Sequence, residues 1–361
     1  MKRSLLGILL TVLSALAQTH TYQVTDLGVL PAQQDSIALG INASGTVVGR
    51  SGSRAFVYTN CQMYDLGLLP GGSSAIANAI NNQSVVAGQA VGPDSLTHAV
   101  SWQDNSIHLL QPGNTYQSQA VAISSPGKIV GYEFNGLFAF GTAYENDEPV
   151  SLPSDNDPIY GLGYVEVVTG ANGSGQLIGY RAINNSLNQF IARIALMIPA
   201  GGSSWVRVPT PGGFDQYVIP AAINEDGAIA GSGQNAAGVS RAFLSDNPSA
   251  VARDLGTLGG TNSAAFGLNN SQWVVGSADT VSAASAFLYD GAHMIDLNTT
   301  LVNGKGWHLS KALGINDYND IVGVGVHDGQ SRAFLLTPVK GLVQVLPCIV
   351  SIEGSDKPAD Q

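Results

Sequence analysis

Charged residues are scarce in this chain, and basic residues are the scarcest. Among 361 residues there are 15 Lys and Arg and 26 Asp and Glu, which gives 11% charged residues and a formal net charge of −11. A protein that binds nucleic acid or an anionic membrane through phosphates needs an excess of basic residues. The composition therefore argues against both of these as partners.

Helical patterns and long apolar runs are also missing. Beyond the first 17 residues, no stretch keeps a helical period with capping residues at both ends, and none is long enough to cross a bilayer. Glycine, in contrast, is abundant at 44 residues. Many glycines with few charges are typical of short strands joined by tight turns, so we expect an all-β protein without membrane insertion.

The start of the chain differs from the rest. Residues 1–17 have two basic residues, then an apolar stretch, then the small-x-small sequence Ala15-Leu16-Ala17. This is the pattern of a secretory signal peptide. We expect cleavage near Ala17, a secreted protein (extracellular or periplasmic), one folded domain over residues 18–340 and a C-terminal tail over 341–361.

One unit recurs seven times within residues 18–340, most clearly at 254–287. Its landmarks are an Asp-Leu-Gly turn, an Ile-Asn pair, an apolar pair closed by glycine, and an Ala-Phe-like pair. The glycine always lies seven residues beyond the Asn, or beyond Ser124 in the third unit, at Gly49, Gly88, Gly131, Gly179, Gly231, Gly276 and Gly323. An offset kept seven times indicates a true repeat. The last landmark is predicted to end at Phe56, Val100, Phe140, Ile191, Phe243, Phe287 and Phe334.

Each unit predicts four short strands, which is the signature of a propeller blade. The residue two before each Asn or Ser is Gly or Ala in every copy, so one face of the first strand carries almost no side chain. Such a strand fits the crowded centre of a ring. Residues 22–28 form a strand without partners, and the last unit lacks its fourth strand. We therefore predict a monomeric seven-bladed β-propeller of four-stranded blades, closed by the N-terminal strand.

The repeat resembles that of the extracellular HAF-repeat family, named for a His-Ala-Phe tripeptide. The resemblance rests on DLGTLGGTNSAAFGLNNSQWVVG from residue 254, together with RAFL and SAFLYDG. Only His98-Ala99-Val100 keeps the histidine, which is replaced by Arg54, Arg241 and Arg332 in three copies. The resemblance covers almost the whole mature chain and is weakest in the third and fourth units. It implies a secreted bacterial repeat protein of unassigned activity.

Motifs for catalysis and for metal binding are absent from the sequence. The six histidines show no metal-ligand spacing, and there is no nucleophile elbow, P-loop or dinucleotide fingerprint. We expect no metal and no cofactor. The acidic segments 155–157 and 317–320 do not follow a calcium-loop pattern, and the recurrent Asp of Asp-Leu-Gly fits a turn cap.

The connections between units suggest a ligand-binding rim. In a propeller, the connections from each fourth strand to the next first strand lie on one face of the disc. Several of them carry aromatic residues, which suit sugar rings or protein partners. The candidate ligand-binding residues are Tyr116, Tyr160, Tyr164, Phe214, Tyr217, Trp307 and His308. The alternative is that these side chains plug the channel or pack between the longer loops.

Three functions are compatible with the sequence. The first is a non-catalytic propeller that binds a polysaccharide or a cell-surface protein. The second is a polysaccharide hydrolase or lyase with its site at the channel mouth, and the third is a structural surface protein without a ligand. A hydrolase needs two carboxylates about 5–9.5 Å apart. Its candidates are weak, since no motif selects a pair among Asp155, Asp157, Glu166 and Asp215. We favour binding over catalysis.

The chain has only two cysteines, Cys61 and Cys348. An exported protein folds in an oxidising compartment, where an even number of cysteines favours pairing. We predict a Cys61–Cys348 disulfide that ties the tail across the closure of the ring. The alternative is two unpaired thiols.

Overall fold

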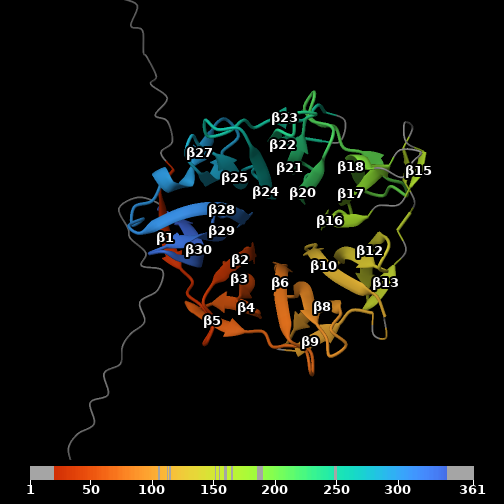
Figure 1. Ribbon diagram of the computed structural model, residues 1–361, viewed down its shortest axis with the longest axis horizontal. Coiled ribbons are helices and arrows are strands. Elements are labelled where there is room, and N and C mark those ends of the chain that lie inside the picture. Colours follow the sequence, from red (N-terminus) through yellow and green to blue (C-terminus); the bar gives the residue numbers. More distant parts are fainter. Residues whose placement is uncertain are drawn as a thin grey trace, which may run out of the picture.

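The computed structural model describes residues 20–339 except 105, 112, 114, 151, 154, 158–160, 164–165, 185–189 and 248–249, and only the backbone of 155–157, 161–163, 184 and 190–191. The expected signal peptide and C-terminal tail lie outside the described residues. The described chain forms seven four-stranded antiparallel sheets around a common centre, which confirms the predicted seven-bladed β-propeller (Figure 1). Within the described residues, no helix is long and apolar enough to span a membrane.

The blades follow one another along the chain. Blade 1 consists of β2 (Ser36–Ile41), β3 (Val47–Ser51), β4 (Arg54–Thr59) and β5 (Gln62–Asp65). Blade 2 consists of β6 (Ser74–Ile80), β7 (Val86–Val91), β8 (Thr97–Gln103) and β9 (Ser106–Leu109). Blade 3 consists of β10 (Gln117–Ile123), β11 (Ile129–Phe134), β12 (Ala139–Glu145) and β13 (Glu148–Val150). A separate hairpin, β14 (Asp155–Asp157) and β15 (Gly161–Gly163), lies between blades 3 and 4 in the chain.

The second half of the ring repeats this order. Blade 4 consists of β16 (Val167–Ala171), β17 (Leu177–Asn184), β18 (Phe190–Ile198) and β19 (Val206–Arg207). Blade 5 consists of β20 (Ile219–Ile223), β21 (Ile229–Gln234), β22 (Ser240–Ser245) and β23 (Arg253–Asp254). Blade 6 consists of β24 (Ser263–Leu268), β25 (Val274–Asp279), β26 (Ala284–Tyr289) and β27 (Met294–Asp296), followed by the 3₁₀ turn η1 (Leu297–Thr299).

Blade 7 joins the two ends of the described chain. Its strands are β28 (Trp307–Ile315), β29 (Ile321–His327), β30 (Gln330–Pro338) and the N-terminal β1 (Tyr22–Asp26), which pairs antiparallel with β30. Asn303 adds two hydrogen bonds to the backbone of Val24, at 2.8 and 2.9 Å. The predicted closure by the N-terminal strand is therefore confirmed.

The first strand of each blade is innermost, as its small side chains predict (Figure 1). Each of these strands has a register shift opposite the glycine of the third landmark, as between Ala265 and Gly267. An added Cβ on Gly276 would lie 2.0 Å from the backbone oxygen of Ala264. The repeated glycine is therefore required by a bulge in the neighbouring strand, which brings a carbonyl against it.

The fourth landmark was predicted wrongly in blades 3 and 4. In the other blades, the Phe or Val of this landmark pairs with the glycine, as Phe287 does with Gly276. In blade 3 the partner of Gly131 is Thr142, and in blade 4 the partner of Gly179 is Leu196. Phe140 instead lies two residues nearer the β11–β12 turn and is 38% exposed. The blade 4 hairpin is unusually long, which shifts its sequence relative to the sheet, whereas the blade 3 hairpin has the same length as those of blades 6 and 7 and carries its Ala-Phe pair two residues early.

The predicted turn caps are confirmed. The Asn of the second landmark accepts the backbone N–H four residues on, as Asn42 does from Thr46 at 3.0 Å, and Asn42, Asn81 and Asn316 also accept the N–H two residues on. The Asp of Asp-Leu-Gly accepts the N–H two residues on, as Asp254 does from Gly256 at 2.8 Å. Both side chains are therefore engaged by the backbone in a structural role.

Candidate binding surfaces

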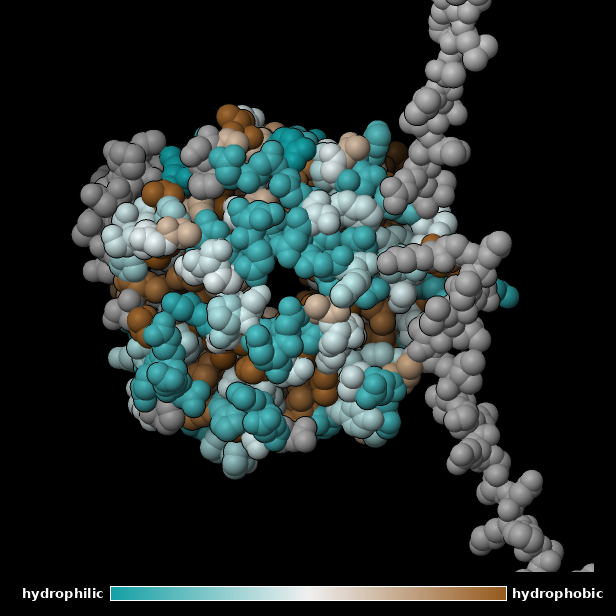
Figure 2. Space-filling model, turned by 180° about the vertical axis from the view of Figure 1, so that it is seen from behind, coloured by the Kyte–Doolittle hydropathy of each residue, from teal (hydrophilic) through white to brown (hydrophobic). Residues whose placement is uncertain are grey.

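The two faces of the disc carry different connections. We call the upper face the side that carries the connections between blades and the turns between second and third strands. The lower face carries the turns between first and second strands and between third and fourth strands. Seen from the side opposite to Figure 1, the disc has a central opening edged mostly by hydrophilic residues (Figure 2).

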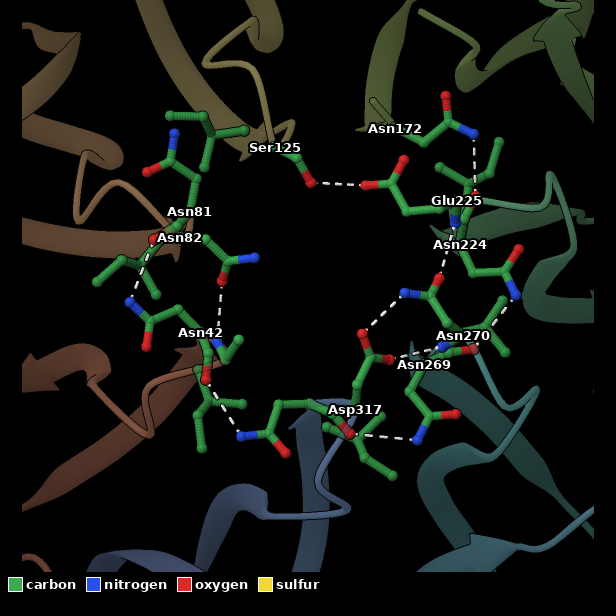
Figure 3. A pocket seen from close by; sticks show the side chains of 18 of the residues that line it. Asn42, Asn81, Asn82, Ser125, Asn172, Asn224, Glu225, Asn269, Asn270 and Asp317 are labelled. Atoms are coloured by element: carbon green, nitrogen blue, oxygen red, sulfur yellow. Dashed lines mark hydrogen bonds between the residues drawn. The ribbon is translucent and has the colours of Figure 1, made fainter. Parts of the chain in front are cut away.

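A ring of asparagines surrounds the lower mouth of the channel (Figure 3). The side-chain Nδ2 of one Asn donates to the backbone oxygen of the Asn in the next blade. Five such bonds of 2.9–3.2 Å run from Asn42 to Asn81, Asn172 to Asn224, Asn224 to Asn269, Asn269 to Asn316 and Asn316 to Asn42. The series is interrupted at blade 3, where Ser124 replaces Asn and lacks an amide.

A second ring lies one residue further along each turn. The backbone N–H of Asn270 donates to Asp317 at 2.9 Å, and the N–H of Gly173 donates to Glu225 at 2.7 Å. Because Gly173 has no side chain, Glu225 reaches past blade 4 and accepts from the Ser125 hydroxyl at 2.6 Å (Figure 3). The carboxylates at this mouth are therefore engaged in joining blades.

The channel mouth is a polar cup of about 320 Å³ with Ile and Leu side chains below the amides. Its amides and carboxylates bond to one another. The described part of the chain contains no group of three or more His, Cys, Asp or Glu residues that could hold a metal ion. The arrangement is suited to holding seven blades together.

The upper face collects most of the exposed large apolar side chains in the described chain. Leu137 and Phe138, at the tip of the β11–β12 turn, are 80% and 63% exposed. The Phe138 and Phe140 rings meet edge to face at 6.4 Å. Further exposed residues on this face are Tyr116, Tyr217, Val281 and Val302. The lower face has Val251 and Tyr318.

The predicted ligand-binding residues have different surroundings. Tyr116 is exposed, whereas the Trp307 ring stacks on His327 at 4.5 Å and meets Phe334 edge-on, so it packs within blade 7. Phe214 lies beneath the Arg241 guanidinium at 5.8 Å, and His308 Nε2 is 3.2 Å from the backbone oxygen of Ala284. Two further residues of the set lie outside the described residues, Tyr160 and Tyr164.

The remaining member of the set, Tyr217, belongs to a stack that the sequence did not reveal. The Arg193 guanidinium lies 4.5 Å from the Tyr180 ring centre and 4.4 Å from that of Tyr217. Burial raises the pKa of the Tyr180 phenol, an effect that Arg193 partly offsets. The three residues are far apart in the sequence, and only the strand register and the connection between blades 4 and 5 bring them together.

The weak catalytic candidates do not form a described pair. Asp215 is exposed and accepts a hydrogen bond from the Gln216 amide at 3.2 Å. The backbones of Asp155 and Asp157 form β14, but their side chains lie outside the described residues. A catalytic role for these residues stays a prediction.

Of the two cysteines, Cys61 lies within the described residues. Cys61 lies in the β4–β5 turn on the lower face, as predicted, and takes part in a disulfide. Cys348 lies outside the described residues. The Cys61–Cys348 pairing stays a prediction.

Comparison with known proteins supports the fold and no more. No protein-family model and no curated protein matches the chain. The β-propeller domain of the Trilobed protease from Pyrococcus furiosus is similar, with a TM-score of 0.51, 8% identity, and coverage of 89% of this chain and 98% of that one. TolB from Acinetobacter baumannii gives a TM-score of 0.47 at 11% identity, covering 85% of this chain and 64% of TolB, and so less than two thirds of its length. Similarities at this identity show a β-propeller and no particular activity.

Proposed function

We propose that this protein is a secreted, non-catalytic binding propeller that recognises a glycan or a surface protein through its upper face. The observation that carries the proposal is the concentration of exposed aromatic and aliphatic side chains on that face. Leu137 and Phe138 stand at a hairpin tip with little cover. Exposed apolar side chains that cluster on one surface commonly mark an interaction site.

The contrast between the faces supports this assignment. On the lower face the Asn ring and Glu225 use their polar groups to join blades. On the upper face the connections differ between blades in length and in aromatic content. Variable loops on a rigid framework are where proteins commonly place binding residues.

The types of exposed residue favour binding. Aromatic side chains are enriched in binding interfaces, where a few of them provide most of the binding free energy. Tyrosine also offers a flat apolar face with a polar end, which suits a sugar ring. Secretion is supported by the signal-peptide pattern of residues 1–17.

A binding screen with matched variants tests the proposal. The mature protein is tested against immobilised polysaccharides and against extracts of surface proteins, and each ligand found is then measured with Phe138→Ala, Tyr217→Ala and Tyr318→Ala. We expect at least one upper-face variant to weaken binding by about tenfold or more, the effect of losing a central aromatic contact. Tyr318→Ala removes an exposed tyrosine from the lower face and should leave binding unchanged. Loss of binding in Tyr318→Ala alone would contradict the proposal.

A further inference from the structure

Arg193 is held between two tyrosine rings without a partner for its charge. Its guanidinium makes no hydrogen bond or ion pair within the described chain, and its Nε atom is buried without an acceptor. Five other arginines each have an oxygen acceptor, and two more have a partner of some kind: Arg50, Arg54, Arg241, Arg253 and Arg332, and then Arg181 and Arg207. A buried N–H without an acceptor is unfavourable, and the rest of the half-buried guanidinium has no acceptor either, so the unused donors point to an external anion.

The backbone fixes this guanidinium in place. The Arg193 N–H donates to the Gln216 oxygen and the Val218 N–H donates to the Arg193 oxygen, both at 2.9 Å. These bonds place Tyr217 beside Arg193. Tyr180 pairs with Ala195, which makes it a diagonal neighbour of Arg193 on the same face of blade 4. Both rings lie over the guanidinium carbon, with their centres 4.5 and 4.4 Å from it, and Arg193 as a whole is half-buried.

The edge of a guanidinium matches a carboxylate. Its N–H groups lie in one plane and can form two parallel hydrogen bonds to the two carboxylate oxygens. Acidic groups near the stack disfavour the binding of a dianionic group, such as a phosphate, relative to a single carboxylate. Glu166 lies near Tyr180, and Asp215 is two residues before Tyr217, so both act on the group bound at this one position. Their repulsion acts twice as strongly on a phosphate dianion as on a single carboxylate.

We propose that the Tyr180–Arg193–Tyr217 stack binds the carboxylate of a uronic acid residue in an acidic polysaccharide, an inference that rests on the binding role proposed for the upper face. Tyr217 is 36% exposed and lies at the surface of the stack. Its ring can pack against the C–H face of a pyranose while the guanidinium edge binds the carboxylate. The exposed ring beside the guanidinium favours a carboxylate that is carried on a sugar ring, and an acidic peptide is the alternative that the test distinguishes.

The test compares three probes with the mature protein at low salt. Oligogalacturonate carries the proposed group, a neutral galacto-oligosaccharide of equal length lacks it, and poly-glutamate carries carboxylates without sugars. Binding is measured for the parent, Arg193→Gln, Arg193→Lys and Arg253→Gln. Arg253 pairs with Asp246 at 2.7 Å near the β22–β23 connection of the lower face, so it is a matched control.

We expect tight binding of oligogalacturonate alone. Arg193→Gln should weaken it by about ten- to a hundredfold, the effect of losing hydrogen bonds to a charged group. Arg193→Lys should weaken it less, and Arg253→Gln should leave it unchanged. If Arg193→Gln fails to fold, the affinity of Arg193→Lys for oligogalacturonate tests the inference, because this variant keeps the charge but loses the planar pair of donors.

Three results would overturn the inference. They are parent-like binding by both Arg193 variants, equal binding of the neutral oligosaccharide, and Arg193-dependent binding of poly-glutamate as tight as that of oligogalacturonate. If oligogalacturonate fails to bind but Phe138→Ala weakens binding of another ligand, the uronate inference is wrong while the proposed binding face stands.

Discussion

At the scale of single residues, one asparagine in each of five blades performs two tasks. Its Oδ1 caps the turn that follows the innermost strand, and its Nδ2 donates to the next blade, as Asn224 does to the Asn269 oxygen at 3.2 Å. The fourth residue of the same turn has a positive φ in every blade. Glycine adopts this freely, but Ser84 and Gln272 also adopt it, with φ of 63° and 59°.

The strain in these two turns can be relieved. A left-handed conformation costs an L-residue about 1–2 kcal/mol, which exceeds the backbone entropy penalty of about 0.5–1 kcal/mol for glycine. We therefore expect Ser84→Gly and Gln272→Gly each to stabilise the protein by about 0.5–1 kcal/mol. Thermal or urea unfolding measures this. Gly45→Ala, at φ 79°, should be destabilising, and the same sign for all three would refute the turn account.

Of the two interactions of this asparagine, the sequence predicted only the cap within its own turn. An Asn at a fixed place before a tight turn indicates its cap, because the bonds run to residues two and four positions on. The bond from each Asn to the next blade depends on how closely two turns approach in space, which no spacing records. The same reason hid Arg193, whose ring partners come from β17 and from the connection before blade 5.

At the scale of an element, the innermost strand sets the pattern of the blade. Its bulge brings a carbonyl against the second strand, where only glycine leaves room. The Gly or Ala two residues before the Asn in the innermost strand lets neighbouring blades approach, since a Cβ on Gly40 would lie 3.3 Å from Ala79 Cα. The small residues of the repeat are therefore required by two separate contacts, one between the first and second strands of a blade and one between neighbouring blades.

The bulge predicts a sharp difference between two glycines. A Cβ on Gly276 would clash with the Ala264 oxygen at 2.0 Å and with the Phe287 ring at 2.6 Å. We expect Gly276→Ala to destabilise the protein by about 3 kcal/mol, at the upper end of overpacking costs. Gly212→Ala is the control, since nothing lies within 4 Å of its added Cβ. Similar unfolding midpoints for the two variants would contradict the role of the bulge.

Element boundaries were predictable where the units keep equal lengths. Seven innermost strands and their turns follow from the fixed seven-residue offset. The third strand of blade 4 differs from the prediction because its hairpin is longer than the others, and that of blade 3 differs because its Ala-Phe pair at Phe140 is not the pair that faces the glycine. Its pairing and its 38% exposure place it on the rim instead.

At the scale of the molecule, the N-terminal strand holds the ring closed. Tyr22 is 1% exposed and packs in the core between blades 6 and 7. Burial, with a further effect of Asp320, raises the pKa of its phenol well above the usual 10.0. Because β1 supplies the outer strand of blade 7, removal of residues 22–28 should destabilise the whole domain in one cooperative transition. A truncated protein that melts like the parent would show that closure is not needed.

The pKa of Tyr22 gives a dependence on pH. Its stabilising effect is complete below pH 10 and is lost as pH rises, because the unfolded phenol ionises while the folded one stays neutral. Each such tyrosine lowers the free energy of unfolding by about 1.4 kcal/mol per pH unit in that range. Tyr22→Phe should therefore reduce the slope of stability against pH above 10. An unchanged slope, measured by urea unfolding, would contradict the buried phenol.

The predicted Cys61–Cys348 disulfide would join the turn of blade 1 to the C-terminal tail. Such a cross-link stabilises folded proteins by about 2–5 kcal/mol. Thiol titration of the unfolded, unreduced protein should find no free thiol. Two free thiols per chain would refute the pairing.

The central claim is that ligand binds on the upper face, and blocking one face at a time tests it most directly. Ala237 in the β21–β22 turn and Val251 in the β22–β23 connection are both exposed and lie on opposite faces of blade 5. Each is changed to Cys, coupled to a bulky polymer, and tested for binding to a ligand found in the screen. The account predicts that polymer at position 237 abolishes binding and polymer at position 251 does not. Binding that survives at 237 and is lost at 251 would contradict it.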